Sequence, residues 1–402
     1  MSRVKLASSH IAAAIAGAVI GAVLVLGVDG LTRTVPPSPA TPQLQEPLEI
    51  LPGVHPASAR VLLAWSPLGV PASLARSLDR MSVVERTTIV EAGLDWIVST
   101  RSADGTESDR MPNGYGIPME LAVISPRAYA PFVPASERDR ILRLRSGEIL
   151  LARTAAALRA ATPGAVIRLG DGRALTMTAS VSDQATQGYE GLIAGPVPRS
   201  WARADRFVLT LLRRGQGREA VERRIRAVVG PGHVLRIRAQ GETPFLRYGD
   251  AVLPQMLVKK TFGEFSARSL GDGSIEIEPQ WKQQNLVTQR VPLLGRVQCH
   301  AAIFPQLRGA IQEVIDSGLA FAINPEQFGG CYGPRFIDRN PGGRLSHHSW
   351  GIAVDVNVAE NIPGTKPDQD RRLVEIFEDH GFTWGGRWLI PDGMHFEWVA
   401  WP

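Results

Sequence analysis

The chain has 402 residues, enough for roughly two or three domains of ordinary size. Its 44% hydrophobic and 21% charged residues exclude a mainly disordered protein. Forty-four Lys and Arg against 39 Asp and Glu leave a formal net charge of +5, too small a bias to indicate a nucleic-acid partner. Two cysteines exclude a disulfide-rich scaffold and any metal site built from several thiolates.

An uncharged apolar segment lies near the start of the sequence. Residues 11–28 are rich in Ala, Val, Ile and Leu, and Arg3 and Lys5 precede them. Eighteen helical residues rise about 27 Å, at the short end of what spans a bilayer. The preceding positive charge favours an N-terminus inside the cell. We therefore predict a signal anchor over residues 1–30 that ties the chain to the membrane, with a cleaved signal peptide as the alternative. The rest of the chain is then extracytoplasmic, as a single-pass membrane protein or a secreted one.

A proline-rich stretch follows the apolar segment and separates it from a mixed region. Residues 31–57 lack any hydrophobic period, which predicts an extended linker. Residues 58–250 indicate a mixed α/β domain: a Gly-Asp-Gly turn at 170–172 lies between two alternating apolar stretches, and residues 219–229 have helical periodicity. A loose similarity of residues 145–177 to extracytoplasmic domains of ABC-transporter permeases carries no chemical motif. We expect this domain to be a spacer or to bind an unidentified envelope partner.

Two short strands near the C-terminus gather the chemistry-bearing residues. Residues 352–358 alternate as a strand, which puts Ala353, Asp355 and Asn357 on one face. A carboxylate among apolar neighbours is costly to bury unless a cation or hydrogen bonds compensate it. A second strand after Asp392 projects His395 to the same side as Glu397. We also expect a helix that begins near residue 367 and ends at Gly381, between the two strands.

The histidines and acids of these strands form a metal-ligating set. With His348, the residues Asp355 and His395 offer two imidazoles and one carboxylate, which suits Zn²⁺ with water in the fourth position. An additional carboxylate nearby could take the proton of that water. His347 adjoins His348, and a strand-like alternation would point only one of the two inward.

The same residues carry a resemblance to a known family. The sequence SHHSWGIAVD at 346–355 resembles the S-x-H-x-x-G-x-A-x-D signature of the VanY-like D-alanyl-D-alanine carboxypeptidases. That family of zinc peptidases also includes L-alanyl-D-glutamate endopeptidases. WGGR at 384–387 followed by DGMHFE at 392–397 is similar to the second half of the family pattern. The resemblance is close over residues 325–400 and looser from 262, which implies a zinc peptidase domain over residues 262–402.

The resemblance implies a role for each matching residue. It makes His348, Asp355 and His395 the zinc ligands, and it puts Asp392 at the position of the catalytic base. Arg335 matches an arginine that orients substrate or stabilises the oxyanion, although Arg339 and Arg344 lie close in sequence. Ser346 would then bind substrate or support a zinc ligand, and Glu397 would orient His395.

Two further pairs of residues are left with open interpretations. Trp384 and Trp388 either line a substrate cleft or pack in the core. Cys299 and Cys331 form a plausible disulfide outside the cytoplasm, which would close the loop ahead of the site.

We therefore expect an α+β fold whose C-terminal zinc-peptidase domain has a small antiparallel sheet and packed helices, after the mixed α/β domain and the transmembrane helix. The expected activity is zinc-dependent hydrolysis of peptide bonds in peptidoglycan stem peptides, by carboxypeptidase or endopeptidase action. The alternative is a zinc-containing wall-binding or scaffold protein without catalysis.

Overall fold

The computed structural model describes residues 59–399 apart from residues 113, 202–203 and 252. The predicted signal anchor of residues 1–30 and the predicted linker of residues 31–57 lie outside the described residues. Within the described ranges, no helix combines the length and the apolar content needed to cross a membrane.

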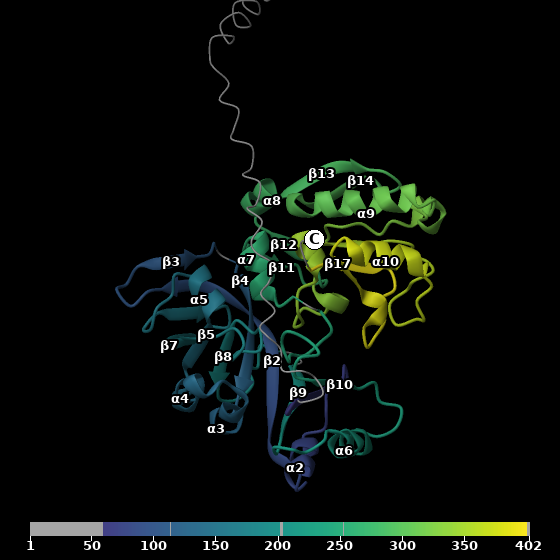
Figure 1. Cartoon of the computed structure of the whole chain (residues 1–402). Coiled ribbons are helices and arrows are strands. Elements are labelled where there is room, and N and C mark those ends of the chain that lie inside the picture. The colour runs from purple at the N-terminus through teal and green to yellow at the C-terminus, as the bar shows by residue number, and fades with distance from the viewer. Residues whose placement is uncertain (1–58, 113, 202–203, 252, 400–402) are drawn as a thin grey trace, which may run out of the picture. The chain divides into compact units, whose positions relative to one another are not determined.

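A mixed sheet forms the middle part of the described chain (Figure 1). Its strands follow the order β10-β1-β9-β2-β4-β8-β5-β7-β6, with β3 added alongside β2. Most neighbours are antiparallel, but β4 runs parallel to β8 and β5 runs parallel to β7. The strands are β1 (Val61–Trp65), β2 (Val84–Arg101), β3 (Glu107–Arg110), β4 (Ile117–Ile124), β5 (Glu148–Ala152), β6 (Val166–Leu169), β7 (Ala174–Val181), β8 (Gly191–Ala194), β9 (Asp205–Leu212) and β10 (Arg236–Ala239).

Short helices pack on this sheet, and two local predictions for the region are confirmed. Helix α6 covers the predicted range Glu219–Val229, and Gly230 ends it at a φ of 93° that favours glycine. The Gly-Asp-Gly turn joins β6 to β7 as an antiparallel hairpin, with Gly172 at a φ of 88°. The other helices of this region are α2 (Ser73–Asp79), α3 (Pro126–Tyr129), α4 (Arg138–Arg143) and α5 (Arg153–Leu158).

The C-terminal part combines helices with three small antiparallel sheets. Two of them are hairpins, β11–β12 and β13–β14, and the third has the order β15-β17-β16. Helix α9 packs against α10, as Figure 1 shows. The elements are α7 (Gln255–Phe262), β11 (Ala267–Ser269), β12 (Ile275–Ile277), α8 (Pro279–Asn285), β13 (Leu286–Val291), β14 (Gly295–His300), α9 (Phe304–Asp316), the 3-10 turn η8 (His347–Trp350), β15 (Ala353–Asp355), α10 (Arg371–Asp379), β16 (Phe382–Trp384), the 3-10 turn η9 (Gly385–Arg387) and β17 (His395–Trp398).

Two of the predicted C-terminal elements differ from the observed ones. The helix α10 begins at Arg371 rather than near residue 367, because the Asp370 side chain caps it by accepting a hydrogen bond from the Arg372 N–H. The strand predicted over residues 352–358 stops at Asp355, and Asn357 has a φ of 53°. The Asn357 amide donates to the carbonyl oxygen of Ala322, so it does not share a strand face with Asp355.

One hydrophobic core joins the C-terminal elements to the middle sheet. It holds Trp350, Val354 and Phe396 together with Leu94 of β2 and Ala155 of α5. The predicted mixture of helices and small antiparallel sheets is confirmed, whereas the predicted division at residues 250–262 stays a prediction.

Buried ion pairs also link the two regions. The Lys259 ammonium of α7 lies 2.7 Å from Glu190 Oε2 and 3.0 Å from Glu264 Oε1. Arg159 at the end of α5 donates to both Glu264 carboxylate oxygens, at 2.6 and 2.7 Å. Burial alone would raise the pKa of the Glu264 carboxyl, but Lys259 and Arg159 outweigh burial and lower that pKa from 4.5 to about 2. The two buried cations are therefore compensated by carboxylates that must be ionised to do so.

Replacing Glu264 should destabilise the fold. Glu264→Gln removes the carboxylate closest to Arg159 and leaves Glu190 and Asp109 to compensate Arg159 and Lys259, and breaking a buried pair costs about 3 kcal/mol or more. Because the pKa of folded Glu264 is lowered, its stabilising effect is present above about pH 4.5 and is lost as the pH falls toward 2. Urea unfolding at pH 7 and at pH 3 should show the difference from wild type shrinking in acid. Glu276→Gln, which removes an exposed ion pair with Arg268, is the control and should change the free energy of unfolding far less. Equal losses in both variants would contradict this assignment.

Candidate metal centre

Three side chains from separate elements converge on one point. His348 lies on η8, Asp355 ends β15, and His395 begins β17. The antiparallel register pairs Asp355 directly with His395. Asp355 Oδ1 lies 3.1 Å from His348 Nε2 and 3.1 Å from His395 Nδ1, and the two ring nitrogens lie 3.2 Å apart. All three residues are buried.

The spacing of these atoms fits a tetrahedral metal ion. Bonds of about 2.0–2.1 Å to zinc require ligand atoms about 3.3 Å apart. The three observed separations lie close to that value. Two imidazole nitrogens and one carboxylate oxygen are the donor set of catalytic zinc sites, which keep a position for water. Among the described residues the cluster has these three members, so it suits an ion with one position open.

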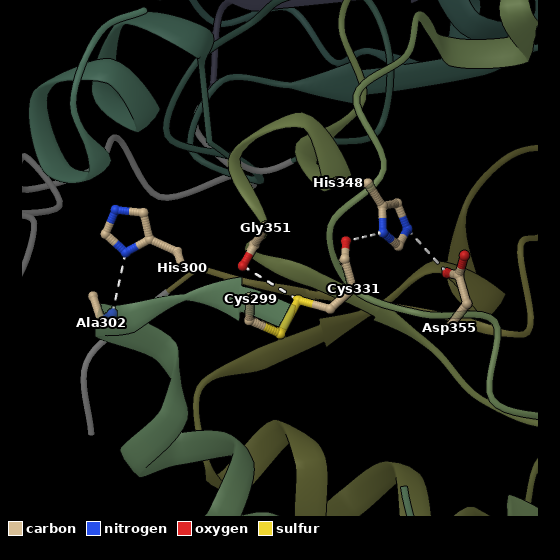
Figure 2. Close-up of a disulfide and its surroundings, with 7 residues drawn as sticks. All are labelled: Cys299, His300, Ala302, Cys331, His348, Gly351 and Asp355. Carbon is tan, nitrogen blue, oxygen red and sulfur yellow. Dashed lines mark hydrogen bonds and ion pairs between the residues drawn. A yellow bond between two sulfur atoms is a disulfide. The ribbon is translucent and has the colours of Figure 1, made fainter. Parts of the chain in front are cut away.

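Each imidazole is held so that its lone pair faces the cluster. His348 Nδ1 lies 2.7 Å from the carbonyl oxygen of Cys331, which can only accept a hydrogen bond, so Nδ1 carries the proton (Figure 2). His395 has the opposite arrangement, since its Nε2 lies 3.5 Å from Glu397 Oε2 and its Nδ1 faces the cluster. A proton acceptor on the outer nitrogen orients a ligating histidine and increases its basicity.

The charges around the cluster favour a cation at its centre. Burial lowers the pKa of His348 below its ordinary value. Burial would lower the pKa of His395 as well, but hydrogen bonds to Asp355 and Glu397 raise it to about 10. Burial acts to raise the pKa of Asp355, yet the two histidines outweigh it and hold that pKa well below its usual range. These carboxylates therefore stabilise positive charge at the position where the three ligand atoms meet.

His347, the other histidine of the His347–His348 pair, contacts a different carboxylate. His347 Nδ1 lies 2.8 Å from Glu397 Oε2, the same oxygen that lies 3.5 Å from His395 Nε2. Both His347 and His348 are buried, because the segment forms a 3-10 turn and not the strand that the alternation predicted. Ser346 precedes this turn and caps it, since its Oγ accepts a hydrogen bond from the His348 N–H at 3.3 Å.

Asp392 lies in the loop before β17 and brings a further carboxylate to the site. Its backbone N–H donates to Gly385 O at 3.0 Å, and its carbonyl oxygen accepts from the His395 N–H at 3.2 Å. Burial raises the pKa of the Asp392 carboxyl to about 6, against the lowering effect of His395. Its Oδ1 atom is buried and has no hydrogen-bond partner among the described residues. An unsatisfied buried carboxylate oxygen is the group one expects where water or substrate binds.

Arg335 is the arginine that faces the cluster. Its Nη2 lies 3.8 Å from Asp355 Oδ2. Ser349 fixes its backbone, because Ser349 Oγ accepts from the Arg335 N–H at 3.1 Å and donates to the Arg335 carbonyl at 3.2 Å. Arg344, a sequence alternative, instead lies 3.5 Å from Asp205 and above the Tyr248 ring. Arg339, the other alternative, is exposed.

The two tryptophans of the WGGRW segment differ in their contacts. Trp384 Nε1 donates to the carbonyl oxygen of Gly393 at 2.8 Å and so holds the turn after Asp392. The Trp388 ring lies 5.1 Å from the His395 ring, centroid to centroid. Of these two tryptophans, Trp388 is therefore the one whose ring lies against a cluster residue.

Residues of the middle region hold the loop that carries Trp388. The Leu389 N–H donates to Asp250 Oδ2 at 2.7 Å, and Arg236 donates to the Arg387 carbonyl at 3.3 Å. Sequence reasoning did not identify Asp250 or the contact of His347 with Glu397. Asp250 lies 139 positions from Leu389, and no local pattern marks such a pairing.

A buried His-Asp-His cluster beside an unsatisfied carboxylate is the arrangement of a metal-dependent hydrolase. Residues 339–398 match a family model described as D-alanyl-D-alanine carboxypeptidase, which confirms the resemblance that the motifs of this segment predicted. The matched segment contains the three cluster residues, Asp392 and Glu397, whereas Arg335 precedes it.

The similarity to a solved structure is weaker. The crystal structure of the periplasmic region of MacB from Actinobacillus actinomycetemcomitans is similar at 11% sequence identity and a TM-score of 0.32. That similarity covers 47% of this chain and 93% of the MacB chain. No curated protein matches the sequence.

Zinc binding should depend on the cluster and on its supporting carboxylate. The full-length protein, freed of metal, should bind about one Zn²⁺ per chain, and His395→Ala should abolish tight binding. Glu397→Gln should weaken binding about 10–100-fold, because it removes the acceptor beside His395 Nε2. Competition with a chromophoric chelator measures the affinities, with His233→Ala, an exposed histidine, as the control. Unchanged binding in His395→Ala would exclude this cluster as the zinc site.

Proposed function

We propose that this chain is a zinc-dependent peptidase that hydrolyses peptide bonds in peptidoglycan stem peptides. The action is that of a D-Ala-D-Ala carboxypeptidase or of an L-Ala-D-Glu-type endopeptidase. The observation that carries the proposal is the buried His348–Asp355–His395 cluster, whose ligand spacing fits zinc, with the unsatisfied Asp392 carboxylate in the adjoining loop. The peptidase family match over the same segment supports it.

Each residue around the cluster has a separate role in the proposed reaction. His348, Asp355 and His395 would hold a zinc ion, which would supply Lewis acidity toward the scissile carbonyl and toward a bound water. Asp392 accepts a proton from the attacking water and returns it to the leaving amine. Arg335, held by Ser349, contributes positive charge where the oxyanion develops.

We also propose an extracytoplasmic location. The apolar segment and the proline-rich linker support a membrane anchor with the peptidase outside, or a secreted protein if the signal is cleaved. The Cys299–Cys331 disulfide supports an oxidising compartment. In that location, stem peptides are the proposed substrate. The predicted N-terminal anchor would attach the chain to the membrane, and the middle region would bind an unidentified envelope partner.

Digestion of defined stem peptides tests the activity and the bond cleaved. Peptides ending in D-Ala-D-Ala, with internal L-Ala-D-Glu bonds, should be shortened by the purified full-length protein, and mass spectrometry then shows whether D-Ala or an N-terminal fragment is released. Chelation should abolish turnover and added Zn²⁺ should restore it. Without the ion, only Asp392 and Arg335 remain to act on the substrate, and nothing activates the water. A protein that holds zinc and cleaves no peptide of the set would instead be the non-catalytic wall-binding or scaffold protein.

Asp392→Asn should separate the base from the metal ligands. The substitution removes the proton acceptor and keeps the shape, so kcat should fall about 10²–10⁴-fold while zinc affinity stays within a few-fold of wild type. Asp338→Asn is the matched control: it removes one exposed carboxylate from the 3-10 turn at residues 337–339, and the charge of that carboxylate acts on the pKa of Asp392. Its kcat should change only a few-fold. Full activity in Asp392→Asn would rule out this residue as the base.

A further inference from the structure

We propose that the Cys299–Cys331 disulfide positions two of the three metal ligands, so that a tight metal site forms only in the oxidised chain. The inference rests on the proposed function in one respect, namely that the cluster holds zinc. It goes further by making metal binding depend on a covalent bond outside the ligand set.

The segment that contains Cys331 is bonded to both ligand residues. We call residues 329–333 the cysteine strap. The carbonyl oxygen of Cys331 accepts the hydrogen bond from His348 Nδ1 at 2.7 Å. The Asp355 N–H donates to Gly330 O at 3.1 Å, and the Asp355 carbonyl accepts from the Gly329 N–H at 2.8 Å. The position of the strap therefore sets the direction of the His348 ring and the place of the Asp355 backbone.

The cysteine strap has little regular structure to hold it. It contains no helix or extended strand, only the single bridge between Gly330 and Asp355. Besides its bonds to the ligand residues, it is joined to β14 by the Tyr332 N–H, which donates to Gln298 O at 3.0 Å, and by the disulfide itself. An irregular segment of this kind costs conformational entropy to order, and a covalent link restricts the alternatives.

The other cysteine belongs to the element that supports η8. Cys299 lies in β14, and the next residue, His300, donates its N–H to Gly351 O at 2.9 Å. Gly351 ends η8 at a φ of 66°, so close to β14 that a Cβ there would lie 2.8 Å from His300 N. Cys331 Sγ lies 3.3 Å from the same Gly351 oxygen. The disulfide thus ties the support beneath η8 to the strap that orients His348, as Figure 2 shows.

Burial makes this link a condition of maturation and not a reversible switch. Cys299 is 0% exposed and Cys331 is 3% exposed, so a reductant does not reach the sulfur atoms of the folded chain. The bond forms during folding, when the two thiols give up two protons and two electrons to another disulfide, which becomes two thiols. A chain that folds where no such disulfide is available lacks the tie between η8 and the strap.

Removing the disulfide should weaken zinc binding more than it disturbs the fold. In full-length Cys299→Ser/Cys331→Ser, zinc affinity measured by chelator competition should fall about 10–100-fold, as it does when the groups that orient ligands are lost. Excess zinc should restore part of any peptidase activity. Val297→Ala, which truncates a buried residue of the same strand β14, is the control. It should lower the unfolding midpoint and leave zinc affinity unchanged.

A second variant tests the strap with both cysteines in place. A Cβ on Gly329 would lie 2.9 Å from Asp355 Cβ and 2.7 Å from Val358 Cγ1, so Gly329→Ala pushes the strap away from Asp355. It should also weaken zinc binding about 10-fold or more, because Asp355 then loses its place among the ligands. If the double serine variant does not fold, the zinc affinity of Gly329→Ala is the measurement that tests the inference.

The outcomes distinguish this inference from the proposed function. Zinc affinity close to that of wild type in a folded double serine variant would overturn the inference, and so would an equal loss in Val297→Ala. If the double serine variant is unfolded, unchanged affinity in Gly329→Ala overturns the inference instead. A wild-type protein that binds no zinc contradicts the proposed function itself, whereas a wild type that binds zinc and a variant that binds it equally well contradict only the role of the disulfide.

Discussion

The site depends on one pairing, that of Asp355 with His395 across two very short strands. Strand β15 has three residues and β17 has four, so little ladder is available to fix their register. Burial fixes it instead: Val354 and Phe396, each fully buried, face the core opposite the ligands. A slip of one residue would exchange these apolar side chains with Asp355 and His395 and put a carboxylate into the core. The hydrophobic core is therefore what holds a carboxylate oxygen and an imidazole nitrogen 3.1 Å apart.

The same register brings a second buried carboxylate to the site. Ala353 pairs with Glu397, which brings this second buried carboxylate beside His395, and His347 contacts the same Glu397 oxygen. Burial would raise the pKa of Glu397, but His347 and His395 hold it well below its usual range. The raised pKa of His395 and the lowered pKa of Asp355 have one cause, which is that positive charge is favoured between them. A metal ion bound at that place would displace a proton, so we expect metal binding to release one.

Much of the site could be predicted from the sequence because its elements are local. The alternation of β17 puts His395 and Glu397 on one side, and the motif spacing marks the same three residues that the fold brings together. The strand around Asp355 was predicted too long, because alternation alone does not reveal that Asn357 turns the chain and bonds to Ala322 and Gln369. The contact of His347 with Glu397 was missed because the segment is a 3-10 turn, in which adjacent residues need not face opposite ways. The middle sheet's strand order rests on pairings far apart in the chain, for which the sequence has no local signal.

The middle region reaches the site through the loop before β17. Asp250 and Arg236 bind the backbone of this loop at Leu389 and Arg387. Within the loop, Gly385 approaches Asp392 so closely that a Cβ there would lie 2.7 Å from the Asp392 carbonyl oxygen. A shift of the loop therefore moves the Trp388 ring and the Asp392 carboxylate together, while the ligands on η8 and β15 are held separately by the cysteine strap. The cluster residues on η8 and β15 and the Asp392 carboxylate thus depend on different parts of the chain, and the middle region contributes to the position of Asp392 through contacts that no motif in its own sequence marks.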